Sequence, residues 1–142
     1  MITGELALLT AAAFAGAAVY VSLVEQPARL HLAPGPLLAQ WQPSYARAAR
    51  MQGALALLAT ALGLAAWYAS GDGRWLAGAG LSLANWPYTL LVLLPTNRAL
   101  MAIPPETADE SVRPLIRHWG RLHAVRSGLG LAAAAAFLWA LH

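Results

Sequence analysis

The residues best suited to chemistry lie on one predicted helical stripe that holds Trp119, His123, Arg126 and Gly130. At 100° per residue, these four positions fall within an arc of about 60°. The imidazole could take up a proton as a general base near neutral pH. The guanidinium could stabilise the resulting anion, the indole could stack on a flat ring, and the glycine leaves room for a close neighbour. The stripe therefore predicts a site for proton abstraction from an aromatic molecule.

The same stripe also has a purely structural interpretation. A polar cluster at the mouth of an apolar helix is costly in lipid, so its members need partners within the protein. His123 would then be a hydrogen-bonded anchor at a helix end, and Arg126 would form an ion pair with Glu25 across the bundle. A pair between Glu25 and Arg29 is a further expectation, because these residues are four positions apart. Neither interpretation excludes the other, since a paired arginine can still orient a ligand.

Composition identifies the environment of the chain. Only 11% of the 142 residues are charged and the mean hydropathy is +0.55, whereas soluble domains are about 25% charged. We therefore predict one integral membrane domain over residues 1–142, with the lipid bilayer as its partner. Nucleic acid is excluded as a partner, because the arginines cluster beside apolar runs, where they act as topology signals. The absence of cysteine excludes disulfides and thiolate metal sites.

Four apolar runs are long enough to cross a bilayer as helices. The predicted spans cover residues 2–24, 51–69, 75–94 and 124–141, so the expected fold is an all-α, four-helix antiparallel bundle in the membrane. We expect residues 30–50 to form a connection that Pro34-Gly35-Pro36 breaks. The first run lacks a basic leader segment, which indicates that it is retained. Small-residue faces on several spans would also permit a homo-oligomer.

The distribution of arginine predicts the orientation of the bundle. The first and third connections carry seven arginines and the second carries Arg74 alone, so the positive-inside rule places both termini outside. All basic residues are arginine and the apolar runs are rich in alanine, which indicates a bacterial chain in the inner membrane. With this orientation, the polar motifs of spans one, three and four converge at the cytoplasmic face around one cavity mouth.

Three short motifs in this order resemble a known family. Pro95-Thr96-Asn97-Arg98 ends the third span, a Trp-x-x-x-His-x-x-Arg pattern opens the fourth, and small residues followed by Glu25-Gln26-Pro27-Ala28-Arg29 end the first. This arrangement resembles the anthrone oxygenase-like membrane family over nearly the whole chain. The resemblance implies a four-span fold. It also implies, from some fungal members, oxidation of an anthrone to an anthraquinone without a metal or flavin, whereas most bacterial members have no assigned reaction.

Two function hypotheses follow for this chain. The first is a cofactor-free, anthrone oxygenase-like protein that binds a small hydrophobic aromatic ligand, with His123 as base and Arg126 as anion stabiliser. Its predicted substrate-binding residues are Trp119, Asn97, Glu25, Arg29, Tyr20 and Asn85. The second is a non-enzymatic membrane protein in which these polar groups lock the helices together, with Asn85 forming an interhelical hydrogen bond.

No metal site is predicted from the histidines. His118 and His123 are five residues apart and point about 140° away from each other on a helix, so they cannot form the i, i+4 pair of a helical metal site. A haem held by two histidines would need a second intramembrane histidine facing His123. Haem and quinone stay open as ligands, although no cofactor is expected.

Overall fold

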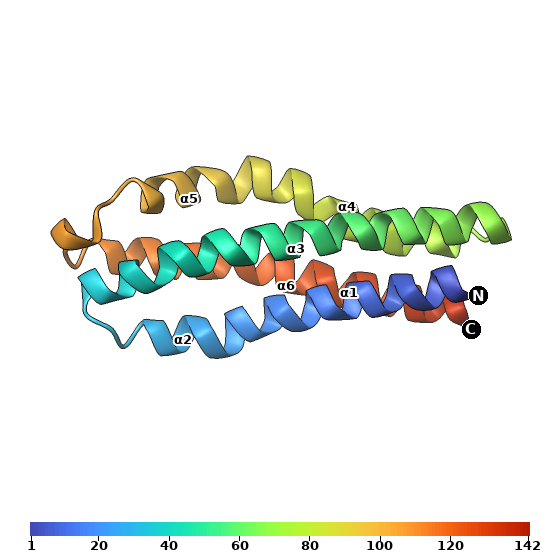
Figure 1. The fold of residues 1–142 in the computed structure, drawn as a ribbon, viewed down its shortest axis with the longest axis horizontal. Coiled ribbons are helices and arrows are strands. Elements are labelled where there is room, and N and C mark those ends of the chain that lie inside the picture. The colour runs from blue at the N-terminus through green and yellow to red at the C-terminus, as the bar shows by residue number, and fades with distance from the viewer.

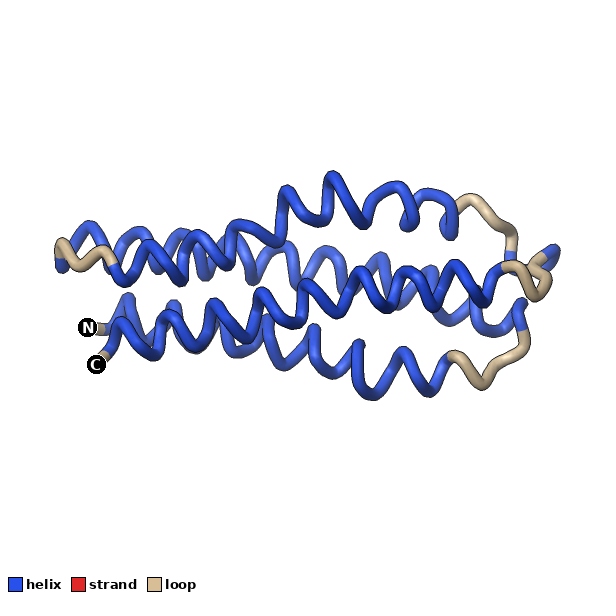
Figure 2. The backbone as a smooth tube through the Cα atoms, turned by 180° about the vertical axis from the view of Figure 1, so that it is seen from behind, coloured by secondary structure: helices blue, strands red, loops and turns tan.

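The computed structural model describes all residues 1–142 as four antiparallel helical rods joined by three connections (Figure 1). Helices and loops are the only elements present (Figure 2). The first rod comprises α1 (Ile2–Tyr20), η1 (Val21–Glu25) and α2 (Gln26–Arg29), and the second is α3 (Pro34–Ser70). The third rod comprises α4 (Arg74–Tyr88), η2 (Thr89–Leu93) and α5 (Leu94–Met101). The fourth is α6 (Val112–Leu141), which follows a short turn, η3 (Pro105–Thr107). The predicted all-α, four-helix antiparallel bundle is confirmed.

The surface of the bundle is suited to lipid. Each of the four rods is long and apolar enough to cross a membrane, and large apolar side chains such as Leu9, Leu23 and Leu91 are 66–78% exposed. Ten polar side chains, Gln52 and His123 among them, are in contrast buried between the helices. This distribution is the one expected when hydrocarbon surrounds the protein and polar groups face the bundle interior.

The helices extend beyond the predicted spans, and the predicted break over residues 30–50 is wrong. The loop ends at Ala33, and α3 runs without interruption from Pro34 to Ser70. Proline fits the first turn of a helix because the amide hydrogens there have no helical acceptor. Pro43 is tolerated inside α3, and the neighbouring Gln42 side chain donates hydrogen bonds to the carbonyls of Leu100 and Ile103, which ties this turn to the end of α5.

Two wide helical turns interrupt the first and third rods at equivalent places. The π-helical segments η1 and η2 each end two residues before a proline, Pro27 and Pro95 respectively. A proline ring crowds the carbonyl four residues earlier and offers no amide hydrogen to it. In both rods that carbonyl, of Leu23 or Leu91, lies within the wide turn. Both turns pack against α6, so the prolines reshape the two rods at the level where α6 carries its polar stripe.

Close packing of small residues closes the half of the bundle that holds the termini. The ring of Phe137 lies against Gly63 of α3 and Gly78 of α4, where a β-carbon would collide with it. Gly130 of α6 likewise faces Phe14 of α1, whose ring a β-carbon would meet at 2.7 Å. This last contact confirms the close approach predicted for Gly130. A residue with φ of 71°, Gly71, ends α3 and starts the tight turn into α4.

Candidate functional site

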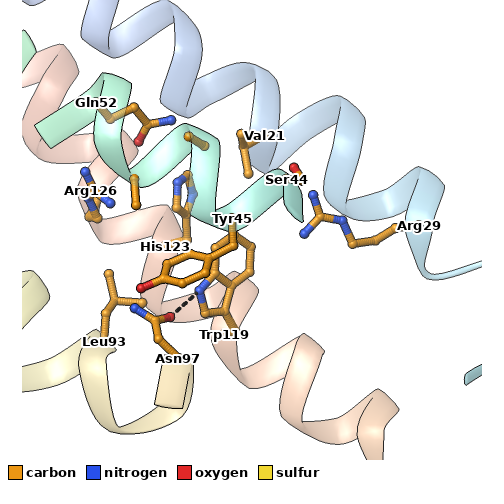
Figure 3. Close-up of a pocket in the computed structure, with 12 residues that line it drawn as sticks. Val21, Arg29, Ser44, Tyr45, Gln52, Leu93, Asn97, Trp119, His123 and Arg126 are labelled. Atoms are coloured by element: carbon orange, nitrogen blue, oxygen red, sulfur yellow. Dashed lines mark hydrogen bonds between the residues drawn. The ribbon is translucent and has the colours of Figure 1, made fainter. Parts of the chain in front are cut away.

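The predicted polar stripe of α6 lines a small buried cavity in the half of the bundle that lies away from the termini (Figures 1 and 3). The lining comes from η1, α2, α3, η2, α5 and α6 and includes Arg29, Tyr45, Gln52, Asn97, Trp119, His123 and Arg126. Its volume is about 20 Å³, which is room for about one water molecule. The side chains around it are therefore nearly in contact with one another.

His123 is fixed on one side and free on the other. It is 3% exposed, and its Nδ1 lies 3.2 Å from the Ser22 hydroxyl, which in turn lies 2.8 Å from the hydroxyl of Ser127. Its Nε2 makes no hydrogen bond, and its ring stacks on Trp119 with the centroids 4.9 Å apart. The imidazole is thus oriented by η1 of the first rod while its second nitrogen stays available.

Aromatic rings from α3 and α6 form a continuous wall beside the imidazole. Trp41 stacks on Tyr45 at 4.8 Å and meets Trp119 edge to face at 5.6 Å. The Trp119 indole donates a hydrogen bond of 2.9 Å to the side-chain oxygen of Asn97 on α5, which Figure 3 shows as a dashed line. Asn97 therefore fixes the plane of Trp119, and three rods cooperate to hold one set of rings.

Glu25 forms an ion pair with Arg29 of the same rod and none with α6. Arg29 donates to Glu25 at 2.8 Å, confirming that predicted pair, and Gln40 and Ser44 of α3 donate to the same carboxylate. The predicted pair between Glu25 and Arg126 is wrong. Ser22 contacts both His123 and Ser127, so Ser22 is level with Arg126, and Glu25 lies about one helical turn nearer the loops.

Arg126 is a buried cation without a counter-ion. It is 6% exposed, no carboxylate lies within ion-pairing distance, and its Nε has no hydrogen-bond partner. The ring of Phe14, 5.5 Å from the guanidinium carbon, is its aromatic neighbour. Since an isolated charge is expensive to bury, this arrangement indicates a place where an anionic or strongly polar group could bind.

Other polar atoms around the cavity also lack partners. Both side-chain atoms of Gln52 are buried without a hydrogen bond, as are Nε and one terminal nitrogen of Arg29 and the indole nitrogen of Trp41. Native interiors leave few such groups unsatisfied. Their concentration here indicates that the site takes up water or a polar ligand.

The predicted site residues separate into three groups. Trp119, His123, Arg126, Asn97 and Arg29 line the cavity together, and Glu25 adjoins it through Arg29.

Two other predicted residues lie outside the cavity. Asn85 is buried deeper in the bundle and bonds to the carbonyls of Leu81 and Ser82 in its own helix, so the expected interhelical bond is absent. Tyr20 is 56% exposed on the outer surface of α1 and lies outside the cavity lining.

Sequence reasoning missed the contribution of α3 to this site. Trp41, Tyr45, Ala48 and Gln52 recur at helical spacing, i, i+4, i+7 and i+11, and together present one face to the cavity region. That periodicity could have identified them, but the segment contains Pro43 and was interpreted as a connection. Ser22, which orients His123, had no distinguishing pattern. His118 is exposed, and nowhere do three histidine, aspartate or glutamate side chains gather as a metal site would require.

Comparison with known proteins identifies relatives of the chain. The family model described as anthrone oxygenase matches residues 41–136, a range that includes most of α3, the η2 turn and the Trp119–Arg126 stripe. A curated anthrone oxygenase of Claviceps purpurea (strain 20.1) is 42% identical over 69 residues, and the match covers 43% of this chain and 40% of that relative. This chain therefore matches well under half of the relative's length. No solved structure matches.

Proposed function

Because this chain belongs to the anthrone oxygenase family, we propose that it oxidises an anthrone-type phenolic aromatic with dioxygen, using the side chains around the His123 cavity. A curated relative carries the name anthrone oxygenase. The finer assignment of substrate and residues rests on the geometry of the site. The observation that carries it is the combination of His123, which makes its hydrogen bond through Nδ1, with a buried Arg126 on the next turn of α6 that has no ion-pair partner.

The proposed reaction starts with proton removal. A hydrogen on Nδ1 donated to Ser22 leaves the Nε2 lone pair free to accept a proton from the methylene carbon opposite the anthrone carbonyl. The electron pair left behind delocalises onto the carbonyl oxygen, giving an aromatic oxyanion. Arg126 would stabilise this oxyanion, and the ring wall of Trp119 and Tyr45 offers flat surfaces for the substrate.

Dioxygen would complete the oxidation without another redox partner. The electron-rich anion reduces dioxygen, and a carbon–oxygen bond forms at the former methylene carbon to give a peroxide. Loss of the remaining hydrogen from that carbon, with cleavage of the oxygen–oxygen bond, yields the second carbonyl and one water. One oxygen atom enters the product, the other leaves as water, and the substrate supplies all four electrons. The reaction as written draws on no resident metal or flavin.

The test is turnover of a hydroxyanthrone by purified protein in nanodiscs. We expect His123→Ala to lower the rate of anthraquinone formation by about 100-fold or more, the usual contribution of a general base. His118→Ala is the matched control, because His118 lies on the same helix but is exposed. It should leave the rate unchanged. Absorbance of the quinone and oxygen consumption measure the same reaction independently, and their ratio should be one to one.

A non-enzymatic role is the second candidate, and one observation favours it. The polar groups do join different rods, since Ser22 bonds to His123 and Trp119 bonds to Asn97. If these groups only lock the bundle, His123→Ala will lower the melting temperature while turnover per folded molecule stays at the wild-type or background level. Wild-type protein that forms no quinone above background, or a His123→Ala variant as fast as wild type, rejects the proposed mechanism.

A further inference from the structure

A second hollow lies between α3 and the η2 turn and shares lining residues with the polar site. Its volume is about 200 Å³, ten times that of the His123 cavity. Trp86 and Leu90 form part of its wall and are 37% and 52% exposed, so the hollow opens on the side that faces lipid. Tyr45 and Arg126 line both spaces, which places the inner end of this groove next to His123.

The groove has an apolar wall with a flat aromatic side. The indole of Trp86 donates a 3.2 Å hydrogen bond to the carbonyl of Gly53 and is held against α3. A β-carbon at Gly53 would lie 3.4 Å from the indole ring, in ordinary van der Waals contact with it, so a larger side chain at this position would extend into the groove. Ala49 and Ala56 of α3 and Leu94 complete the apolar lining. An apolar cavity of about 150 Å³ is enough for benzene in another protein, so this groove has space for an aromatic ring entering from the side.

The inner part of the groove offers polar atoms that nothing in the protein satisfies. Nε of Arg126, Oδ1 of Asn85 and Oγ1 of Thr89 are all buried, all lack a hydrogen-bond partner, and all belong to groove-lining residues. Arg126 and Asn85 are 6% and 2% exposed. A cation and an acceptor at the end of an apolar slot match a flat molecule that carries an oxyanion and a hydroxyl donor. An acyl chain would fill the slot but would leave these polar atoms unpaired.

We propose that this groove is the lateral entrance and binding slot for a phenolic aromatic that arrives from the lipid phase. The molecule enters between Trp86 and α3, its oxygen reaches Arg126, and its reactive edge faces His123. The η2 turn displaces the third rod just before Pro95 and supplies Thr89 and Leu90 to the groove. This inference deepens the proposed function and rests on it for the chemical class of the ligand, but it can be tested without turnover.

The experiment measures binding of 1,8-dihydroxyanthraquinone, a stable compound with no methylene hydrogen to remove, to protein in nanodiscs by equilibrium dialysis. We expect Gly53→Leu, which fills the groove beside Trp86, and Arg126→Gln, which removes the cation, each to raise the Kd by about tenfold or more. Gly80→Leu is the matched control, since Gly80 is exposed with nothing within 4 Å of its would-be β-carbon. It should bind as wild type does.

Folding of the blocked variant needs its own safeguard. If Gly53→Leu is not monodisperse with a wild-type circular dichroism spectrum, Leu90→Trp replaces it, because Leu90 lies half-exposed in the groove wall and a larger side chain there narrows the slot from outside. If a folded variant with a blocked groove binds the probe with wild-type affinity, the groove is not the binding slot. Absence of saturable binding to wild type, or a phospholipid retained in the groove that the probe does not displace, would also overturn it.

The two proposals fail in different ways. If blocking the groove abolishes probe binding while His123→Ala retains turnover, the groove remains the entrance and His123 is not the general base. If turnover depends on His123 while blocking the groove leaves probe binding unchanged, His123 remains the general base and the groove is not the entrance.

Discussion

At the scale of single residues, the contrast between two buried arginines defines the site. Arg29 is 3% exposed and Arg126 is 6% exposed, yet Arg29 has Glu25 as an ion-pair partner and Arg126 has none. Removing one member of a buried pair leaves an uncompensated charge, which is costly. An arginine that is already uncompensated adds little stability or opposes folding. Arg29 is therefore a structural residue of the bundle, and we propose that Arg126 is held for a ligand.

A double-mutant cycle tests this division of roles. We expect Glu25→Gln and Arg29→Gln to lower the free energy of unfolding with a coupling of about 1–3 kcal/mol, so that the double variant loses less than the sum of the two single losses. Glu25→Gln combined with Arg126→Gln should be additive within about 0.5 kcal/mol, because no contact joins the two side chains. Unfolding by denaturant in mild detergent gives these values.

The same cycle could contradict the structure. Strong coupling between Glu25 and Arg126, with none between Glu25 and Arg29, would require the carboxylate to face α6. In that case Arg126 would be a paired, structural residue and would lose its role as an open anion site.

At the scale of elements, glycine-to-aromatic packing sets the spacing of the rods. Gly63 and Gly78 accept the ring of Phe137 between α3 and α4, while the neighbouring Gly80 faces outward with open space around it. These contacts lie in the half of the bundle that holds the termini. They pack the rods closely there, whereas the cavity lies in the opposite half.

We therefore expect Gly78→Ala to destabilise the bundle by about 1–3 kcal/mol, because the added methyl group overpacks against Phe137. Gly80→Ala, two positions later on the same helix, should be neutral or stabilising, since alanine is the better helix former and meets no neighbour. Thermal unfolding of both variants in one detergent makes the comparison. Equal melting temperatures would show that α4 does not pack on Phe137 as described.

Sequence patterns could predict the four helical rods. They could not predict the wide turns in the first and third rods or the residue at which α3 begins. Hydrophobic runs located all four rods, and the spacing of Trp119, His123 and Arg126 placed them on one inward face, as the structure confirms. The entry of α3 was missed because Pro34-Gly35-Pro36 suggests a break, whereas both prolines lie in the opening turn of the helix.

The candidate site was predictable only in part, for a related reason. The three polar residues of α6 could be grouped from one helix alone, since spacing along a single helix fixes their direction. Partners across helices could not, because depth along each rod depends on the wide turns η1 and η2, which add to the length of a turn and have no simple signature beyond a following proline. That uncertainty is why Glu25 was matched with Arg126.

At the scale of the whole molecule, the candidate site lies towards one end of the bundle. Both termini and the α3–α4 turn lie at one end, and the α2–α3 and α5–α6 connections lie at the other (Figures 1 and 2). The His123 cavity belongs to the half nearer those two connections, and the groove opens sideways beside η2. A lipid-soluble substrate could thus reach the site from the bilayer without crossing either aqueous loop region.

The orientation of the bundle in its membrane can be tested directly, because the chain contains no cysteine of its own. The arginine distribution predicts that the α3–α4 turn lies outside and the α5–α6 connection lies inside. We expect Ser70→Cys to react with a membrane-impermeant maleimide in intact cells, and Thr107→Cys to react only after the membrane is opened. Both side chains are exposed in the structure, so access to reagent depends on the membrane and not on burial. The reverse labelling pattern would place the arginine-rich connections and the His123 half of the bundle at the outer face, and the predicted cytoplasmic position of the site would then be wrong.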